Sequence, residues 1–138
     1  MKTPDDIADW VRRETGSKKS IDDATSLQEL GVYGDDWHEL MDVYADRFGV
    51  DMSRYLWYFH TREEGQNFGG LLVPPPHRRA PQIPITLAML RAFADSGKWT
   101  IDYPEHQIPE KRYDILINQV VVGVITVGLV AFLIWKYL

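Results

Sequence analysis

The sequence contains no cysteine. It therefore offers no disulfide, no thiolate nucleophile and no cysteine ligand for zinc or for an iron–sulfur cluster. Its 138 residues have room for about one domain of ordinary size, which excludes a large multi-domain enzyme.

Charged side chains are missing from residues 115–135, which contain no Asp, Glu, Lys or Arg. As a helix these 21 residues would be roughly 31 Å long, close to the thickness of a bilayer's hydrocarbon core. Lys111 and Arg112 precede the run, and Trp135, Lys136 and Tyr137 end it, as is typical of interfacial anchors. We predict a single transmembrane helix at residues 115–135.

A buried core strand or helix is the alternative for this run, because its many β-branched residues also suit strands. The length favours a membrane span, since core strands have only about 4–8 residues and a core helix normally has a polar face. Gly123 and Gly128 are five positions apart, so the sequence lacks a GxxxG dimerisation motif at this point.

The first 14 residues contain no apolar signal-peptide core. We therefore expect the N-terminal domain to stay in the cytoplasm. Lys111 and Arg112 on that side agree with the positive-inside tendency.

Basic side chains are scarce in the first half of the chain. Residues 1–64 have a net charge of −7 and residues 65–112 one of +2, within a total of −5. An acidic surface repels phosphate backbones and attracts basic proteins. We expect a protein partner with a basic surface and no nucleic acid.

The polar part has a helical pattern. Thr3 is an N-cap before Pro4, and Gly16 is the natural end of that first helix. A second helix is predicted at residues 36–48, where Asp35 or Asp36 can cap it and Gly49 ends it. A third follows Thr86 as N-cap and ends before Gly97.

The predicted helix at residues 36–48 has two faces. One face is apolar, and the other is acidic. We define the acidic face by its carboxylates: Asp35, Asp36, Glu39, Asp42 and Asp46. This face is either a solvated surface or a recognition surface for a basic partner.

The remaining segments are less regular. Residues 53–60 are dense in aromatic residues and predict a short helix or extended segment that caps the bundle, with an exposed aromatic box as the alternative. Residues 61–84 are rich in glycine and proline and predict a long connection without regular structure, in which PPPHRR can adopt polyproline II. His77, Arg78 and Arg79 can then face either the acidic face or anionic lipid headgroups.

Residues 1–104 are predicted to form a helical domain, residues 105–114 a juxtamembrane linker and residues 115–135 the membrane helix. The predicted core of the domain contains Trp10, Trp37, Leu40, Tyr44, Phe48, Leu87, Leu90 and Phe93.

Catalytic and metal-binding patterns are absent. The histidines are scattered, with no HExxH, and each is expected at the surface or at a helix cap: His38, His60, His77 and His106. The sequence lacks an EF-hand loop, GxSxG, GxxxxGK and GxGxxG. We expect no enzyme activity, no catalytic residue and no metal site.

The segment LQELGVYGDDWHELMDVYADRFGVD resembles the second-helix region of acyl carrier proteins, where a Leu-Gly turn precedes an acidic helix that ends in phenylalanine. Together with PITLAMLRAFADSGKW, it is similar to an uncharacterised bacterial acyl-carrier-like family, a domain of unknown function, over residues 3–104. This resemblance implies a mainly α fold: a small helical bundle with an acidic docking face, followed here by the transmembrane helix. A bacterial family, the predicted anchor and the expected cytoplasmic domain together point to the bacterial inner membrane as location.

Acyl carriers bear a phosphopantetheine arm on a serine near the start of this helix. With Leu30, Gly31 and Phe48 in register, the serine position falls on Gly34, and no Ser or Thr occurs between Leu27 and Met52. Phosphopantetheine is therefore not expected.

Three functions remain open at this point. The first is a membrane-anchored, non-catalytic adaptor or regulator that docks a basic partner through the acidic face. The second is a small structural subunit of a membrane complex, and the third is an atypical acyl or peptidyl carrier.

Overall fold

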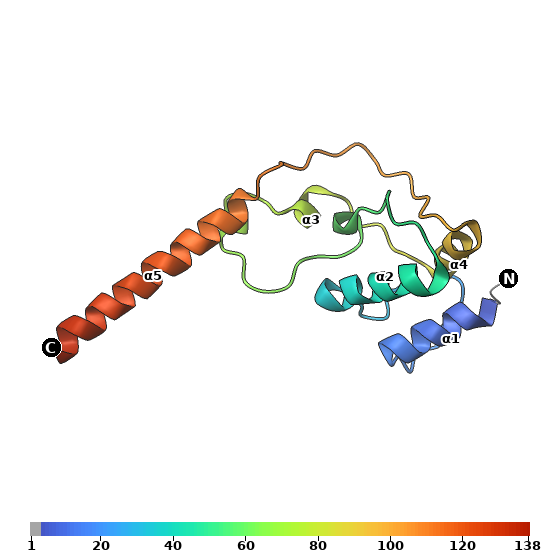
Figure 1. Ribbon diagram of the computed structural model, residues 1–138, viewed down its shortest axis with the longest axis horizontal. Helices are drawn as coiled ribbons and strands as arrows, with labels where there is room; N and C mark the ends of the chain where they lie inside the picture. Colours follow the sequence, from blue (N-terminus) through green and yellow to red (C-terminus); the bar gives the residue numbers. More distant parts are fainter. Residues whose placement is uncertain (1–3) are drawn as a thin grey trace.

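The computed structural model describes residues 4–138, with side chains from Asp6 onward. Its α-helices are α1 (Pro4–Thr15), α2 (Gly34–Phe48), α3 (Pro76–Arg79), α4 (Leu87–Ser96) and α5 (Tyr113–Tyr137). Two 3₁₀ turns, η1 (Trp57–Phe59) and η2 (Gly69–Leu71), lie between α2 and α3. Over these residues the chain contains no strand, only two isolated β-bridges, so the mainly α prediction is confirmed. Figure 1 shows α1, α2 and α4 gathered at one end of the molecule and α5 extending from the other.

Three helices end at the glycines that were expected to end them. Gly16, Gly49 and Gly97 each follow a helix with φ between 61° and 71°, the left-handed conformation in which glycine has no steric cost. The Thr86 hydroxyl accepts a hydrogen bond from the Met89 amide at 3.3 Å, so its capping role is confirmed. The predicted Thr3 cap lies outside the described residues.

The start of α2 differs from the prediction. The helix begins at Gly34, its N-cap residue is Tyr33, and neither Asp35 nor Asp36 caps it. The reason is that Gly34 adopts φ +61° and donates its amide to the Thr61 hydroxyl at 2.8 Å. A threonine distant in the sequence therefore satisfies the first N–H group of the helix, and the two aspartates lie inside the first turn and not before it.

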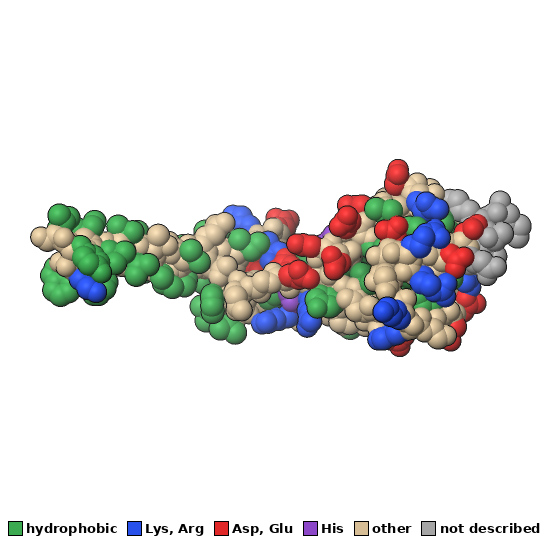
Figure 2. All heavy atoms as spheres, turned by 90° about the horizontal axis from the view of Figure 1, so that it is seen from below, with side chains coloured by type: hydrophobic (Ala, Val, Ile, Leu, Met, Phe, Trp, Pro, Cys, Tyr) green, Lys and Arg blue, Asp and Glu red, His purple; other side chains and the backbone are tan. Residues whose placement is uncertain are grey.

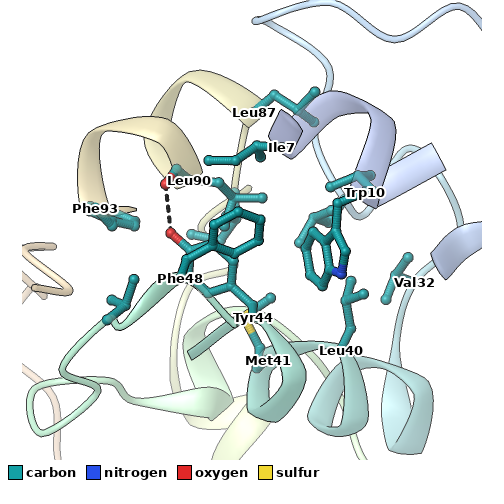
Figure 3. Packing of buried hydrophobic residues seen from close by; sticks show 14 of the residues in the cluster. Ile7, Trp10, Val32, Leu40, Met41, Tyr44, Phe48, Leu87, Leu90 and Phe93 are labelled. Atoms are coloured by element: carbon teal, nitrogen blue, oxygen red, sulfur yellow. Dashed lines mark hydrogen bonds between the residues drawn. The ribbon is translucent and has the colours of Figure 1, made fainter. Parts of the chain in front are cut away.

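The bundle core contains all eight predicted residues. Figure 3 shows Trp10, Tyr44 and Phe48 packed together, with the Trp10 and Phe48 ring centroids 5.3 Å apart in an edge-on arrangement. The Tyr44 hydroxyl donates to the Leu90 carbonyl at 2.6 Å, which joins α2 to α4.

Trp99 is a core residue that the sequence did not reveal. It lies outside the eight predicted core residues, yet it is only 1% exposed. Its amide donates to the Asp51 carbonyl at 3.0 Å, and the Asp51 amide donates to the Gly97 carbonyl at 2.8 Å. This pairing holds the chain after α4 against the bundle.

The aromatic segment at residues 53–60 forms η1 and packs inward. Of the two predicted alternatives, a short helix or an extended segment, the structure has a short 3₁₀ helix over Trp57–Phe59. Phe59 is fully buried, and Tyr55 packs against the core.

The connection at residues 61–84 is more structured than predicted, since it contains η2 and α3. Within PPPHRR, Pro75 has polyproline-II-like dihedral angles, φ −69° and ψ 165°, but the residues after it are helical. Pro76 begins α3, because a proline ring fits the first turn of a helix. Arg78 donates to the Gly70 carbonyl and Arg79 to the Pro74 carbonyl, at 3.3 and 2.7 Å, so neither arginine binds the acidic face.

α5 extends the predicted membrane segment by two residues at each end. It is long and apolar enough to cross a membrane, and its apolar part is not buried against the rest of the molecule. This exposure excludes the alternative of a buried core element. The Thr126 hydroxyl donates to the Val122 carbonyl at 2.8 Å, so this polar side chain is satisfied within the helix.

Candidate functional site

The acidic face is a real surface of α2. All five of its carboxylates are exposed, while the opposite side of the helix is buried in the bundle. None of the five forms an ion pair with a basic side chain of residues 6–138. Figure 2 shows acidic side chains gathered near the middle of the molecule, around the start of α2. The face therefore presents concentrated negative charge to solvent.

A groove of about 260 Å³ runs beside this face, between the end of α1 and α2. Its apolar lining comes from Leu30, Val32, Leu40 and Val43, and its acidic lining from Glu14, Asp36 and Glu39. A lysine or arginine has an apolar stem and a charged head, and both parts are matched by such a lining. Glu14 was missed by sequence reasoning because it lies on a different helix, and only the packing of α1 on the bundle places it in the lining of the same groove as Asp36.

Gly34 occupies the position that corresponds to the carrier serine. Its φ of +61° is unfavourable for any residue with a Cβ, and a Cβ at this position would overlap the side chain of Glu64. Backbone and neighbour therefore both oppose a serine hydroxyl at this position.

His60 is a second departure from the prediction, because it is only 1% exposed rather than at the surface or a cap. Its Nδ1 bonds to the Ile83 carbonyl at 2.8 Å and its Nε2 to the Tyr103 hydroxyl at 2.8 Å. The ring stacks on Tyr55 with centroids 5.8 Å apart and an interplanar angle of 8°. Burial lowers the pKa of His60 from 6.5 to about 4. Both ring nitrogens are occupied, so this histidine serves the core and not a ligand.

A polar cluster at the start of α5 was not foreseen either. Arg112 donates to both carboxylate oxygens of Glu63, at 2.7 and 2.9 Å, and to both of Asp114, at 2.9 and 2.7 Å. Asp114 is 1% exposed and also accepts from the Asn67 side chain at 2.9 Å. The hydrogen bonds that Arg112 donates to Asp114 and, to a smaller extent, to Glu63 raise the pKa of Arg112 above its ordinary range. We call Glu63, Arg112, Asp114 and Asn67 the clamp.

The described residues contain no group of three or more His, Asp or Glu side chains placed to hold a metal ion.

A family model described as "Protein of unknown function (DUF1493)" matches residues 5–102. The chain belongs to this family. The DUF1493 region includes α1 to α4, the acidic face and η2, and it ends before α5 begins. Comparison with curated proteins and with solved structures gives no match.

Within the DUF1493 region, α2 leaves all five carboxylates of the acidic face exposed. The helical period had aligned four of them, Asp35, Glu39, Asp42 and Asp46, and Asp36 lies beside these in the first turn. The groove and the clamp depend on contacts between segments far apart in the chain, such as Glu63 with Arg112, and no local pattern marks them.

Proposed function

We propose that this DUF1493 protein is a membrane-anchored, non-catalytic adaptor or regulator that docks a basic protein partner through the acidic face of α2. The observation that carries the proposal is a set of five exposed carboxylates, none of which pairs with a basic side chain of residues 6–138, beside a groove lined by acidic and apolar side chains. The resemblance of the α2 region to acyl carrier proteins supports the same surface, because carriers dock their partners through an acidic second helix.

The proposed location is the bacterial inner membrane, with α5 as a single-pass anchor and the DUF1493 region in the cytoplasm. The length and composition of α5 support the anchor.

The docking claim is tested with the variant Asp35→Asn, Glu39→Gln, Asp42→Asn and Asp46→Asn in the full chain. These amides keep the shape of each side chain and remove four negative charges. Affinity purification from detergent-solubilised membranes should recover a basic partner with the native chain and lose most of it with the variant.

The matched control removes four exposed carboxylates elsewhere: Asp9→Asn, Asp95→Asn, Glu105→Gln and Glu110→Gln. This control should retain the partner, because the change in net charge is identical and only the position differs. Equal recovery with both variants would contradict docking through α2.

A structural subunit of a membrane complex is the second candidate, favoured by the large apolar surface that α5 exposes. Replacing residues 113–138 with an unrelated transmembrane helix separates the two proposals. Assembly through α5 predicts loss of the complex, whereas docking through the acidic face predicts that the partner is retained.

The atypical carrier is the least supported reading, given the backbone of Gly34 and the position of Glu64. Intact mass after incubation with a phosphopantetheinyl transferase should show no increase.

A further inference from the structure

The η2 segment is fixed against the first turns of α5. The Asn118 side chain accepts from the Phe68 amide at 3.3 Å and donates to the Gln66 carbonyl at 3.4 Å. One turn earlier, Asn67 donates to the buried Asp114 at 2.9 Å. Gly69 lies so close that a Cβ would overlap the Asp114 carbonyl oxygen. Figure 1 shows this part of the connection lying against the start of α5.

These contacts set the height of η2 along the helix. Asn118 lies about 7.5 Å along the axis from Tyr113, at 1.5 Å per residue. The apolar run of α5 begins at Ile115, so η2 lies beside the boundary between the polar end of the helix and its apolar part. When α5 crosses a membrane, η2 must lie at the level of the lipid headgroups.

The surface of η2 is suited to that level. Phe68, Leu71 and Leu72 are 54%, 76% and 75% exposed, although the DUF1493 core has buried most of its other large apolar side chains. The nearby Arg78 and Arg79 are exposed cations. Figure 2 shows hydrophobic side chains continuing from α5 onto the adjoining part of the domain, with basic side chains beside them.

The backbone of this segment is also prepared for a poorly hydrated environment. The amides of Gly70, Leu71, Leu72 and Val73 donate to oxygen atoms of Asn67, Phe68 and Gly69 at 2.9 to 3.2 Å, and the Phe68 amide donates to Asn118. An amide that is already bonded loses little when water is removed, whereas an unpaired one is costly to bury.

We propose that residues 66–73 form a collar that inserts Phe68, Leu71 and Leu72 into the interfacial layer of the membrane that α5 crosses. Arg78 and Arg79 then face anionic headgroups, which attract basic side chains near the surface. The occupant of this apolar patch is lipid, because the patch is continuous with α5 and held at its membrane boundary. The inference rests on the anchoring part of the proposed function and not on the acidic face.

Single-cysteine labelling tests the collar without background, because the chain has no cysteine of its own. The full chain, carrying Leu72→Cys with an environment-sensitive fluorophore, is reconstituted into vesicles of phosphatidylcholine and phosphatidylglycerol that contain lipids with a quencher near the headgroup. Val124→Cys, in the middle of α5, reports the anchor, and Lys18→Cys reports solvent.

The label at position 72 should be strongly quenched by the lipid and shielded from aqueous iodide. The label at position 18 should show the opposite, and the label at position 124 should be quenched by lipids that carry the quencher deep in the acyl chain. Quenching at 124 with iodide access at 72 would overturn the collar and leave the anchor intact. A label at 72 shielded from both quenchers would mean a protein occupant, which also overturns the collar. Absence of quenching at 124 would overturn the anchor and the collar together.

A matched pair of alanine variants tests what sets the depth. Gly69→Ala must move the segment away from the Asp114 carbonyl oxygen, whereas Gly70→Ala meets side-chain atoms at 3.3 Å and needs only a small shift. Lipid quenching at position 72 should therefore fall in Gly69→Ala and persist in Gly70→Ala, with position 124 unchanged in both. Equal quenching in the two variants would refute positioning by contact with α5.

Discussion

His60 is held in one tautomer by its two partners. A carbonyl can only accept, so Nδ1 donates to Ile83 and Nε2 accepts from the Tyr103 hydroxyl. The same hydroxyl accepts from the Trp99 indole N–H at 2.8 Å and from the Leu56 amide at 3.2 Å. A network with this many satisfied groups depends on neutral His60, since a second ring proton would face the hydroxyl's own proton.

The free energy of unfolding should therefore fall in mild acid. Because the pKa of His60 is about 4 in the folded chain and 6.5 in the unfolded one, the unfolded chain binds more protons between these values. The contribution is complete above pH 6.5 and is lost as the pH falls to 4, with a total on the order of 3 kcal/mol. Urea unfolding of the full chain in detergent, followed by tryptophan fluorescence, measures it.

The variant His60→Phe should lose this part of the pH dependence and be less stable at pH 7.5, because Ile83 and Tyr103 lose their partner. His38→Gln, at a half-buried position outside the network, is the control and should keep the native pH profile. A pH profile for His60→Phe that matches the native one would contradict the assignment.

Gly34 gives a second prediction at this scale. Gly34→Ser should lower the free energy of unfolding by more than the roughly 1–2 kcal/mol that a left-handed non-glycine residue costs, because Glu64 must also move. Gly31→Ser is the matched control, with φ +81° and no atom within 4 Å of its Cβ. Adding Glu64→Ala should bring Gly34→Ser back toward the control, and no such rescue is expected if Glu64 is already free to move.

At the scale of the element, the carboxylates at the two termini of α2 have opposite effects on the stability of the helix. Asp35 and Asp36 lie in its first turn, where the helix dipole favours negative charge. Asp46 lies near its C-terminal end, where negative charge is unfavourable, so folding alone does not explain its presence on the acidic face.

Asp46→Asn should therefore raise the free energy of unfolding by about 0.3–1 kcal/mol and at the same time weaken the binding of the proposed partner. Asp42→Asn, in the middle of the helix, should weaken the partner without the gain in stability. Chemical denaturation and affinity purification of the two variants measure both quantities. Partner binding by Asp46→Asn at the native level would remove this residue from the docking surface.

The elements also show where sequence reasoning works. α2 and α4 carry a clear helical period and glycines at their ends, so their type, length and core residues were predictable. η2 contains two glycines and α3 begins at the last of three prolines, and such residues locally predict irregular chain. Their structure comes from distant groups, as where Asn67 binds Asp114, and such contacts leave no periodic pattern. The acidic face was visible in the sequence because it lies on a single helix with a regular period. The clamp was not, because its residues come from segments far apart in the chain.

At the scale of the whole molecule, the clamp joins the DUF1493 region to α5. Arg112→Met should release η2 from the helix, because the carboxylate of Asp114 loses the cation that it pairs with. Hydrogen exchange at the amides of residues 70–73 should then accelerate.

Lys111→Met removes the neighbouring exposed cation and should leave exchange unchanged. Combining Arg112→Met with Asp114→Asn should restore part of the protection, because the uncompensated charge is gone. If the single and double variants exchange equally, the charge of Asp114 is not what the clamp neutralises.

The clamp attaches the DUF1493 region to α5 a second time, by non-covalent contacts, in addition to the covalent connection along the chain. The chain from Trp99 to Arg112 connects the bundle covalently to α5. The hydrogen bond between Asn67 and Asp114 forms a second connection, so bundle, linker and helix form a closed loop. A domain joined to a helix by one linker can rotate about the helix axis, whereas a domain joined at two places keeps a fixed orientation relative to that axis. In a membrane, the acidic face would then lie at a fixed distance from the bilayer and point in a fixed direction around the helix axis. The proposed partner, if it diffuses in the same bilayer, would search for this face in two dimensions instead of three.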